Sequence, residues 1–530
     1  MGASERVIKD NKPMFECMVE FIGYRIYYNL SSWYKMLSFF PAHKLSSEFM
    51  EKMMGVTIRK TFDNNDENTP LTFFRKNLIY LPKTVYQFFR ISITFGSLKF
   101  TVPRFNSYFN KVYSKLNSID LTKLNTKELM SIYNEAAKKL LSRWRAPIAN
   151  DFAVMVSTGA ADKLFKSWLN SSDAYMYMRS DTNTPLVTLD PGKKLANIIS
   201  LIKENPKLKK LFSENEPHKI VNSLENIYSE QQVSVDIRSY IENFGTRIPN
   251  ELKLESETLN EKPENLILLL QSLLQVKSIN KKISKNSVNH NKLKSLNLFR
   301  RIFLKWLLKW ADNSIKRREE SRFKRTLIFG LIREIFINIG IRFEKEQIIN
   351  NKRDIYFLRI DEIFDIINGN KKIDTLRCVT RRKKEFNKWG KIDLAHRFET
   401  IKTVMQLEKE LLKAKLVTKA PEKRTFIGRV ASRPVNTKVV TGVSLSLMDF
   451  DPTADFEGKI LVTRQTDPGW TIVFPLLRGI VVERGGMLSH AAIVARELNI
   501  PCIVGVEKIT SFIKSGVEIT LDLHEGKVKI

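Results

Sequence analysis

The sequence predicts a multidomain protein, with a largely α-helical N-terminal region followed by a C-terminal α/β domain of the β/β/α type. Apolar residues at helical spacing dominate the first four hundred residues, whereas short apolar runs typical of buried strands dominate the last hundred. The composition changes at Ala420-Pro421-Glu422-Lys423, which is the best linker in the chain. A length of 530 residues corresponds to roughly three or four domain-sized units, and 43% hydrophobic residues is ample for packed cores.

The helical region divides into a first segment, residues 1–119, and a helical domain, residues 120–419. Within this domain, Asn125-Thr126-Lys127-Glu128 fits a capping box and opens a helix that runs to Leu141. Pro147 is expected to interrupt the chain before a second helical run, which ends near Trp168. Further helical patterns cover residues 218–244, 265–276 and 296–343, and loops are expected at 170–192, 205–217 and 278–291.

The net charge of +31 is concentrated ahead of the linker. Residues 425–530 hold 12 Lys and Arg against 11 Asp and Glu, whereas residues 276–325 hold 16 against 3. Taken alone, this basic run is compatible with a nucleic-acid or anionic-membrane surface. Its apolar residues fall at helical spacing, however, so we expect them to face a core and the lysines to be solvated. These residues are Phe299, Ile302, Phe303, Trp306, Leu307 and Trp310.

Several classes of protein are not indicated by the sequence. No segment reaches the roughly 18 uncharged apolar residues that a membrane span needs, and the start has no signal-peptide core. Cys17, Cys378 and Cys502 lie far apart, so we expect core fillers in a reduced, cytoplasmic setting. No histidine or cysteine spacing predicts a metal site.

One histidine has the surroundings of a reaction site. Residues 479–482 have the pattern of a buried strand, Gly485-Gly486 form a turn, and an apolar helix follows His490. A turn without side chains leaves room for an anion, and a helix N-terminus supplies free N–H groups to hold it. A neutral imidazole is a nucleophile near neutral pH. The arrangement predicts that His490 carries a phosphoryl group.

Neighbouring polar residues are candidates for supporting that phosphate. Ser489 is predicted to cap the helix and to donate a hydrogen bond to the phosphate. Arg496 lies about two turns along the helix, which favours a structural or interdomain contact over a direct ligand. Glu483 could orient the imidazole or be a solvated carboxylate.

The segment from Phe426 to Ile530 resembles the mobile, swivelling phosphohistidine domain of phosphoenolpyruvate-utilising enzymes. The resemblance is carried by Gly-Gly-x-x-Ser-His-Ala-Ala-Ile-Val-Ala-Arg-Glu, Asn499-Ile500-Pro501 and the flanking strands. It implies that residues 420–425 are a linker about which this domain moves. Val482 stands where the family usually has threonine, and Leu488 occupies the place of a regulatory threonine in plant-type dikinases.

The helical half is similar to the phosphoenolpyruvate synthase and rifampicin phosphotransferase-like members of the same family. Residues 240–252 resemble its Tyr-Gly-His-Arg…Glu-Leu segment, which places Arg247 and Glu251 on the acceptor side or in an ion pair that orders a loop. Thr246 replaces the family's histidine, so no acid/base role is carried over. The family's Arg-Glu-x-x-Arg helix corresponds to a set that we expect to form a structural network or an acceptor-side site, namely Arg318, Glu319 and Arg322.

The resemblance implies a phosphotransferase component of dikinase type. We expect His490 to receive a phosphoryl group from ATP or phosphoenolpyruvate and to pass it to a small-molecule acceptor at the helical domain. No ATP-grasp domain is recognised in these residues, so ATP and Mg²⁺ are expected at a separate ATP-grasp partner, with no cofactor bound by this chain. A degenerate, non-catalytic homologue that acts as a binding or regulatory module is the alternative, favoured by Thr246 and Val482. The acceptor stays open among an antibiotic, pyruvate and other hydroxyl compounds.

Overall fold

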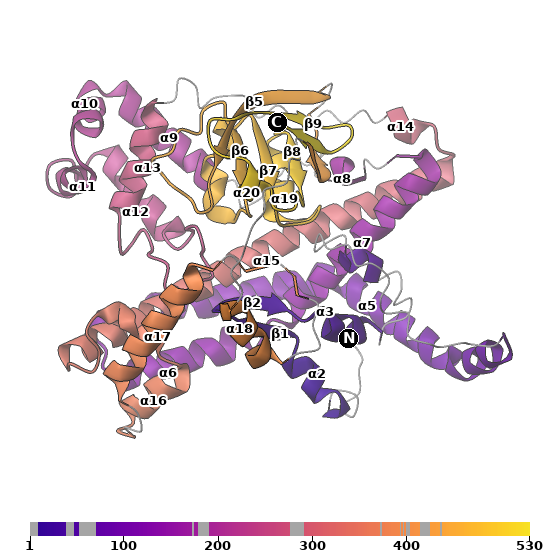
Figure 1. Cartoon of the computed structure of the whole chain (residues 1–530), viewed down its shortest axis with the longest axis horizontal. Coiled ribbons are helices and arrows are strands. Elements are labelled where there is room, and N and C mark those ends of the chain that lie inside the picture. Colours follow the sequence, from indigo (N-terminus) through magenta and orange to yellow (C-terminus); the bar gives the residue numbers. More distant parts are fainter. Residues whose placement is uncertain are drawn as a thin grey trace. The chain divides into compact units, whose positions relative to one another are not determined.

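A computed structural model describes twelve stretches of the chain, which are residues 9–38, 47–51, 70–171, 174–178, 190–275, 291–370, 374–392, 394–395, 397–398, 403–413, 425–434 and 437–530. The chain forms two compact units (Figure 1). Unit 1 comprises residues 1–48, 60–149 and 331–421, and unit 2 comprises residues 49–59, 150–330 and 422–530. Among the described residues, no helix is long and apolar enough to cross a membrane.

Unit 1 is built almost entirely of helices, with one antiparallel hairpin. Its strands are β1 (Val19–Ile22) and β2 (Arg25–Tyr28). Its helices are α2 (Lys12–Glu16), α3 (Leu30–Leu37), α5 (Pro70–Asn117), α6 (Thr126–Ala136), the π-helical turn Ala137–Leu141, α16 (Ile360–Ile367), α17 (Thr375–Gly390) and α18 (Val404–Lys413). Two long helices contribute residues to both units, namely α7 (Arg145–Leu169) and α15 (Leu298–Lys345).

Local signals explain how two of these helices begin. The capping box of α6 is confirmed, since the Asn125 side chain accepts from the Glu128 N–H and Glu128 accepts from the Asn125 N–H. The expected interruption between two helical runs is present, but it lies at residues 142–144 ahead of Pro147, because α7 begins at Arg145 and continues through the proline. Pro147 lies in the first turn, where backbone N–H groups have no intrahelical acceptor, so its missing N–H costs nothing.

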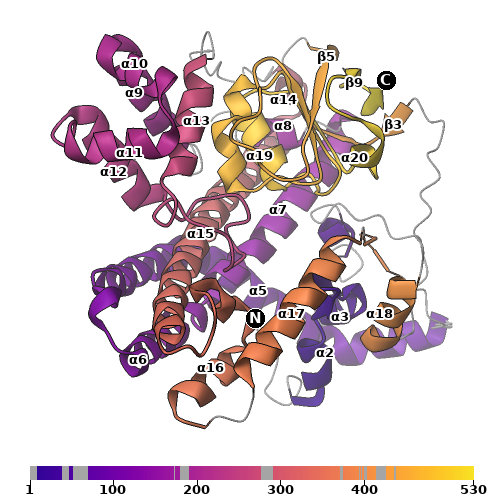
Figure 2. The same ribbon diagram turned by 60° about the vertical axis from the view of Figure 1, so that its left-hand side comes forward.

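Unit 2 contains a group of short helices beside its sheet (Figure 2). They are α8 (Ala174–Tyr177), α9 (Asp190–Glu204), α10 (Pro206–Glu214), α11 (Pro217–Asn226), α12 (Gln232–Phe244), α13 (Glu264–Gln275) and α14 (Asn291–Lys294). The expectation of a loop at 205–217 is wrong, because α10 occupies most of this range. Asn205 caps α10 by accepting from two backbone N–H groups, and Pro206 occupies the first helical position. The loop expected at 170–192 contains α8, and its remainder, like the expected connection at 278–291 and the linker at 420–425, lies mostly outside the described residues.

The C-terminal region forms an eight-stranded mixed sheet of order β3-β10-β9-β5-β6-β7-β8-β4. The four strands β5 to β8 run parallel, and the remaining pairs are antiparallel. The predicted strand at 479–482 is confirmed, and the last two strands, β9 and β10, form an antiparallel hairpin. The strands are β3 (Thr425–Ile427), β4 (Arg429–Ser432), β5 (Val439–Ser446), β6 (Ile460–Thr463), β7 (Gly479–Val482), β8 (Cys502–Val504), β9 (Glu518–Asp522) and β10 (Lys527–Lys529).

Alternating residues of β6 and β7 bury the two faces of this sheet in two cores. Leu461 and Ile480 belong to a hydrophobic core that also contains residues of α9 to α13 and of α19 (His490–Glu497). Ile460 and Val481 face a second core, which is closed by α20 (Ile509–Phe512). This period of two is the signature of a strand that is buried on both faces. The helical part of unit 2 is therefore packed on the domain that carries His490.

The expectation that the apolar residues near the start of α15 face a core is confirmed for Leu307, which is buried, and wrong for several others. Phe299, Ile302 and Trp306 are 78%, 59% and 57% exposed. The core of this part of unit 2 receives another face of α15, which carries Leu304, Leu307, Leu308 and Ala311. The helix thus has two apolar stripes, and spacing alone does not tell which of them is buried. The core-filler expectation for the cysteines is likewise wrong for Cys17, which is exposed, and correct for Cys502.

Candidate active site

Two neighbouring parallel strands place the candidate site residues at one edge of the sheet. β6 and β7 are paired in register up to Thr463 and Val482. The segment after β6 leads to Thr471, and the segment after β7 leads to His490. Because the carboxyl ends of adjacent parallel strands lie at the same edge, these two segments meet there, as in other open α/β sheets.

The loop between β7 and α19 depends on glycine and on one buried arginine. Gly485 has a φ of +123°, and a Cβ at this position would lie 2.8 Å from the Cβ of Ser489. Only glycine therefore allows the loop to fold back on the serine. Arg496 donates to the carbonyl of Met487 within the loop and, through Nε, to the carbonyl of Ala431 at 2.7 Å. Arg496 thus supports the loop structurally, as the sequence favours, while Gly486 accepts the backbone hydrogen bond of Ser489 at 3.0 Å.

His490 is the first residue of α19 and is 3% exposed. Its Nε2 lies 3.1 Å from the Thr471 hydroxyl oxygen, and its Nδ1 has no hydrogen-bond partner within the described part of the chain. Burial, reinforced by the positive charge of Arg322, lowers the pKa of His490 to about 3. The imidazole is therefore neutral at physiological pH, as a nitrogen nucleophile must be.

Ser489 occupies the N-cap position of α19, but its side chain makes no capping hydrogen bond. Capping by this side chain, which the sequence predicts, is therefore absent. The hydroxyl oxygen is buried and has no hydrogen-bond partner among the residues that the structure describes. A buried hydroxyl that is left unsatisfied is costly unless a ligand completes it. It lies next to His490, at the positive end of the α19 dipole, where an anion is stabilised.

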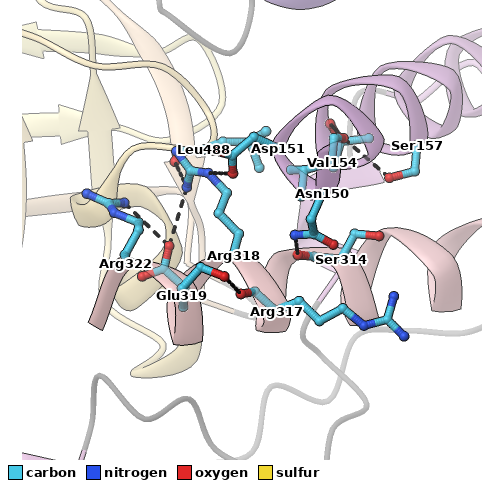
Figure 3. A network of polar contacts seen from close by, with 12 residues as sticks. Asn150, Asp151, Val154, Ser157, Ser314, Arg317, Arg318, Glu319, Arg322 and Leu488 are labelled. Atoms are coloured by element: carbon cyan, nitrogen blue, oxygen red, sulfur yellow. Dashed lines mark hydrogen bonds and ion pairs between the residues drawn. The ribbon is translucent and has the colours of Figure 1, made fainter. Parts of the chain in front are cut away.

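Three residues of α15, which we call the Glu319 cluster, lie beside the histidine loop (Figure 3). They are Arg318, Glu319 and Arg322. The Oε1 atom of Glu319 lies 3.3 Å from Arg318 Nη1 and 3.4 Å from Arg322 Nη1. Arg318 also lies 3.3 Å from Asp151 and donates to the carbonyl of Leu488, two residues before His490, at 3.3 Å. The network that the sequence predicts thus contacts the histidine loop directly.

The electrostatics of the site favour an anion. Burial alone would raise the pKa of Glu319, but Arg322 and Arg318 outweigh it and hold the carboxyl ionised. The positive charges of Arg322, Arg247 and Arg318 all lower the pKa of His490, and only Glu319 opposes them. A neutral imidazole therefore faces an excess of buried positive charge, which stabilises a phosphoryl group placed on its ring.

Arg247 and Glu251 are both buried in the same unit, and Arg247 also acts on His490. The Arg247 guanidinium lies 5.0 Å from the centre of the Phe323 ring. Burial raises the pKa of Glu251 to about 7, although the charge of Arg247 opposes this shift. Thr246, in place of the family's histidine, lies against Gly330, where a Cβ would be 2.3 Å from its methyl group. The Thr246 side chain therefore packs against the helix at Gly330.

A contact between the segment 248–250 and the segment 467–469 was not predicted. Asp467 accepts from the backbone N–H of Asn250 at 2.6 Å and from that of Gly469 at 3.0 Å. Burial raises the pKa of Asp467 to about 6. A Cβ on Gly469 would lie 2.4 Å from the backbone nitrogen of Pro249, so only glycine allows this approach. We call this contact the Asp467 latch, since it joins the histidine domain to the turn that follows α12 and precedes Glu251.

Sequence reasoning also missed Thr471 and misjudged the surroundings of Glu483. The signal for Thr471 was its position in the turn that follows the strand next to β7. Glu483 is 5% exposed and accepts hydrogen bonds from the Thr510 hydroxyl and backbone N–H, so the solvated alternative is wrong. In the described part of the chain, no group of three or more His, Cys, Asp and Glu residues could hold a metal ion.

Comparison with known proteins agrees with this architecture. Residues 148–319 match the rifampicin phosphotransferase fourth domain, and residues 455–526 match the mobile domain of PEP-utilising enzymes. The chain is 23% identical over 411 residues to rifampicin phosphotransferase of Bacillus subtilis (strain 168), covering 74% of this chain and 45% of that protein. It is 49% identical over 94 residues to phosphoenolpyruvate synthase of Aquifex aeolicus (strain VF5), covering 18% of this chain and 11% of that protein.

A second rifampicin phosphotransferase, from Bacillus cereus, is 24% identical over 72% of this chain and 44% of its own length. The chain thus spans less than half the length of these rifampicin phosphotransferases. The two matched domains follow one another along the chain in the order that the residue motifs indicate. The chain is therefore similar to the phosphoenolpyruvate-utilising enzymes, with a segment like the rifampicin phosphotransferase fourth domain ahead of a segment like the mobile domain of PEP-utilising enzymes.

Proposed function

We propose that this chain is a phosphotransferase in which His490 carries the phosphoryl group between a donor and a small-molecule acceptor. The observation that carries this proposal is the neutral, buried imidazole of His490 beside the arginines of the Glu319 cluster. Phosphoryl transfer depends mainly on in-line placement and on stabilisation of charge, and both can be supplied by such an arrangement. The names of the relatives, rifampicin phosphotransferase and phosphoenolpyruvate synthase, support the same class of reaction.

In the first step, the unprotonated ring nitrogen of His490 attacks the phosphorus of the donor. The bond from phosphorus to the donor's oxygen breaks, and that oxygen leaves with the electron pair. The Ser489 hydroxyl, which has no hydrogen-bond partner within the described residues, is placed to donate to the new phosphoryl oxygens. The N-terminal N–H groups of α19, which belong to the same domain as His490, stabilise the remaining charge.

In the second step, a hydroxyl oxygen of the acceptor attacks the same phosphorus. The phosphorus–nitrogen bond breaks, the electron pair returns to the imidazole, and water takes up the hydroxyl proton. The Glu319 cluster lies on the helical side of unit 2, so the acceptor would bind there, with its hydroxyl facing His490. Arg247, which also acts on His490, is placed to assist in holding the phosphoryl oxygens during this transfer.

The donor in this proposal is ATP, held with Mg²⁺ on a separate ATP-grasp partner, or phosphoenolpyruvate. The histidine domain would have to leave the helical segment in order to reach such a donor. The Asp467 latch is the contact that opening would break, because it joins the two parts through Asn250 and Gly469. A carrier that visits two sites accounts for a mobile domain with one reactive histidine.

The rival function is a binding or regulatory module that keeps the fold without the chemistry. Two substitutions favour it, namely Thr246, which packs against Gly330, and Val482, which is buried in β7. Both lie outside the set that contacts the imidazole ring, since the Thr471 hydroxyl supplies the hydrogen bond to Nε2. We therefore favour the enzyme.

Radiolabelled phosphate incorporation tests the proposal. The chain is incubated with labelled phosphoenolpyruvate, and separately with ATP labelled at the β-phosphate and an ATP-grasp protein of a family member. We expect acid-labile label in the wild-type chain and none in His490→Ala, because the nucleophile is gone. His524→Ala is the matched control, since His524 lies exposed in the same C-terminal region and should leave labelling unchanged. Equal labelling of the wild type and His490→Ala would contradict the proposal, and absence of label with either donor would favour the binding module.

A further inference from the structure

The first three turns of α15 expose a row of large apolar side chains, which we call the α15 stripe. It consists of Phe299, Ile302, Phe303 and Trp306, preceded by Leu298 at the helix start. Their exposed fractions run from 40% for Phe303 to 78% for Phe299. Buried residues on another face of the same turns, including Leu304 and Leu307, already anchor the helix in its core. The stripe is therefore not needed for packing, and a contiguous exposed apolar row of this kind indicates a binding surface.

The aromatic rings of this region pack against one another in a tilted arrangement. The centres of Phe303 and Trp306 are 5.7 Å apart, as are those of Trp306 and Trp310, with interplanar angles of 31° and 32°. On the adjacent helix α7, the ring centre of Trp168 lies 6.3 Å from that of Phe303. The Arg300 guanidinium lies 5.4 Å from the ring centre of Trp168. The rings thus support each other and form a rigid apolar ridge along the helix.

Positive charge borders this ridge without any negative charge. From residue 293 to residue 311 the sequence has five basic residues and no acidic one. Lys294, Arg300, Lys305 and Lys309 are exposed in the structure. Long basic side chains beside exposed Trp, Phe and Leu are the composition of a face that lies in a membrane interface, with the cations among the headgroups and the rings among the upper acyl chains.

We propose that the α15 stripe binds the surface of an anionic lipid bilayer. This inference is independent of the phosphoryl transfer at His490. The rings of Phe303, Trp306 and Trp310 are turned partly toward one another, with interplanar angles of 31° and 32°, whereas a single-stranded nucleic acid needs open ring faces on which bases stack. Protein interfaces are depleted in lysine, yet lysine flanks this stripe. A bilayer satisfies both the exposed aliphatic groups and the unbalanced positive charge.

Vesicle flotation tests the proposal. The full chain is mixed with vesicles of phosphatidylcholine, or of phosphatidylcholine with phosphatidylglycerol, at low and at physiological salt. We expect the chain to float with the anionic vesicles only and to be released by high salt. Each basic residue near an anionic surface raises the partition coefficient by about fivefold. Lys305→Glu/Lys309→Glu should therefore abolish flotation, and Phe299→Ser/Trp306→Ser should weaken it at every salt concentration.

Two controls make the result decisive. Lys207→Glu/Lys209→Glu reverses two exposed lysines on α10 of the same unit and should bind vesicles nearly as the wild type does. Phosphate labelling of His490 should be the same in the stripe variants and the wild type, since the residues are outside the reaction site. The proposal is overturned if the wild type does not float, if the stripe variants float like the wild type, or if the same variants instead lose binding to a single-stranded oligonucleotide.

Discussion

Each unit contains a glutamate held by two arginines, and the two clusters differ in how tightly the carboxylate is bound. In unit 1, Arg382 forms a fork on Glu362, with Nη1 2.7 Å from Oε2 and Nη2 2.8 Å from Oε1. Arg359 adds a backbone N–H at 2.7 Å. In the Glu319 cluster, by contrast, Arg318 and Arg322 share a single carboxylate oxygen at 3.3 and 3.4 Å.

The difference distinguishes a structural ion-pair cluster from the proposed reaction site. The Glu362 cluster joins α16 to α17 by short bidentate bonds, which leave its carboxylate fully engaged. The Glu319 cluster lies beside a buried, neutral histidine, and its arginines make longer contacts, so they can turn toward an arriving phosphoryl group with little loss. Both clusters contain ion pairs, so what distinguishes the Glu319 cluster from the Glu362 cluster is the length of its contacts and the excess of buried positive charge around it.

The largest expected effect tests this distinction by removing one arginine from each cluster. Arg322→Ala should slow phosphoryl transfer from His490 by about 10²- to 10³-fold, as loss of one transition-state donor does. Arg382→Ala should leave the transfer rate of folded protein unchanged and lower the free energy of unfolding by about 1–3 kcal/mol. Single-turnover transfer rates and denaturant unfolding measure the two quantities.

Arg322→Lys separates the effect of the positive charge from that of the guanidinium geometry, because lysine keeps the charge but lacks the planar fork. Its transfer rate should lie between those of the wild type and Arg322→Ala. If Arg382→Ala slowed transfer as much as Arg322→Ala, the division into structural cluster and proposed reaction site would fail.

The second effect concerns the loop that brings His490 to the Glu319 cluster. Gly485→Ala should lower the free energy of unfolding by about 3 kcal/mol, since it combines a positive φ with a Cβ that meets Ser489. Gly516→Ala is the matched control, because Gly516 also has a positive φ, of +90°, but nothing lies within 4 Å of a Cβ there. It should cost about 1 kcal/mol from backbone strain alone.

Phosphate labelling should fall in Gly485→Ala and persist in Gly516→Ala, with both variants compared at a temperature where they are folded. Equal losses of stability and labelling in the two variants would show that the contact with Ser489 is unimportant. Circular dichroism in denaturant and labelling under the same buffer conditions provide the measurements.

Much of the histidine domain could be predicted, because its elements are short and locally specified. The buried strand 479–482, the glycine turn and the apolar helix after His490 follow from patterns within a few residues of one another. The contact of Arg318 with the carbonyl of Leu488 spans 170 positions in sequence and could not be inferred from spacing. The same holds for the Asp467 latch, where a backbone N–H of Asn250 carries no side-chain signal.

The helical half was predicted less well for a different physical reason. A helix with two apolar stripes satisfies the same periodicity whichever stripe is buried, so the exposure of Phe299 and Trp306 was missed. An interruption was expected at Pro147 and a loop at 205–217, whereas Pro147 and Pro206 both lie in the first turn of a helix. Position within the helix, which the sequence leaves uncertain, decides the meaning of proline.

The third effect is a contrast in the response to acid. Unfolded chain binds a proton at His490 below pH 6.5, whereas the folded protein does so only near its pKa of about 3. His490 therefore costs stability as the pH falls below 6.5, by about 2 kcal/mol at pH 5. The pKa of Glu362 is lowered, chiefly by Arg382, so its contribution is lost only as the pH falls below 4.5.

The loss of stability that His490 causes in acid is measured from the unfolding free energies of the wild type and of His490→Asn at pH 7.5 and pH 5. The stability of His490→Asn relative to the wild type should rise by about 2 kcal/mol between these two pH values. An unchanged difference would mean that His490 titrates normally and is not held neutral by burial. Arg382→Ala should show no change relative to the wild type in this pH range, because Glu362 titrates below it.

The smallest effect concerns the hydrogen bond that orients the imidazole. Thr471→Val removes the hydroxyl 3.1 Å from His490 Nε2 while keeping the shape of the side chain. Labelling of His490 should slow by about fivefold, which corresponds to the loss of one hydrogen bond of roughly 1 kcal/mol. Thr441→Val is a control in the same sheet, since Thr441 bonds only with Thr520, and it should not alter the labelling rate.

The central claim is that His490 itself holds the phosphoryl group. Peptide mass spectrometry of the labelled chain, with digestion kept at alkaline pH to preserve phosphohistidine, tests it most directly. The account predicts phosphate on His490 within the peptide that follows Arg484, and its disappearance when an acceptor is added. Phosphate that is acid-stable, or that maps to Ser489 or Thr471 in place of the histidine, would contradict it.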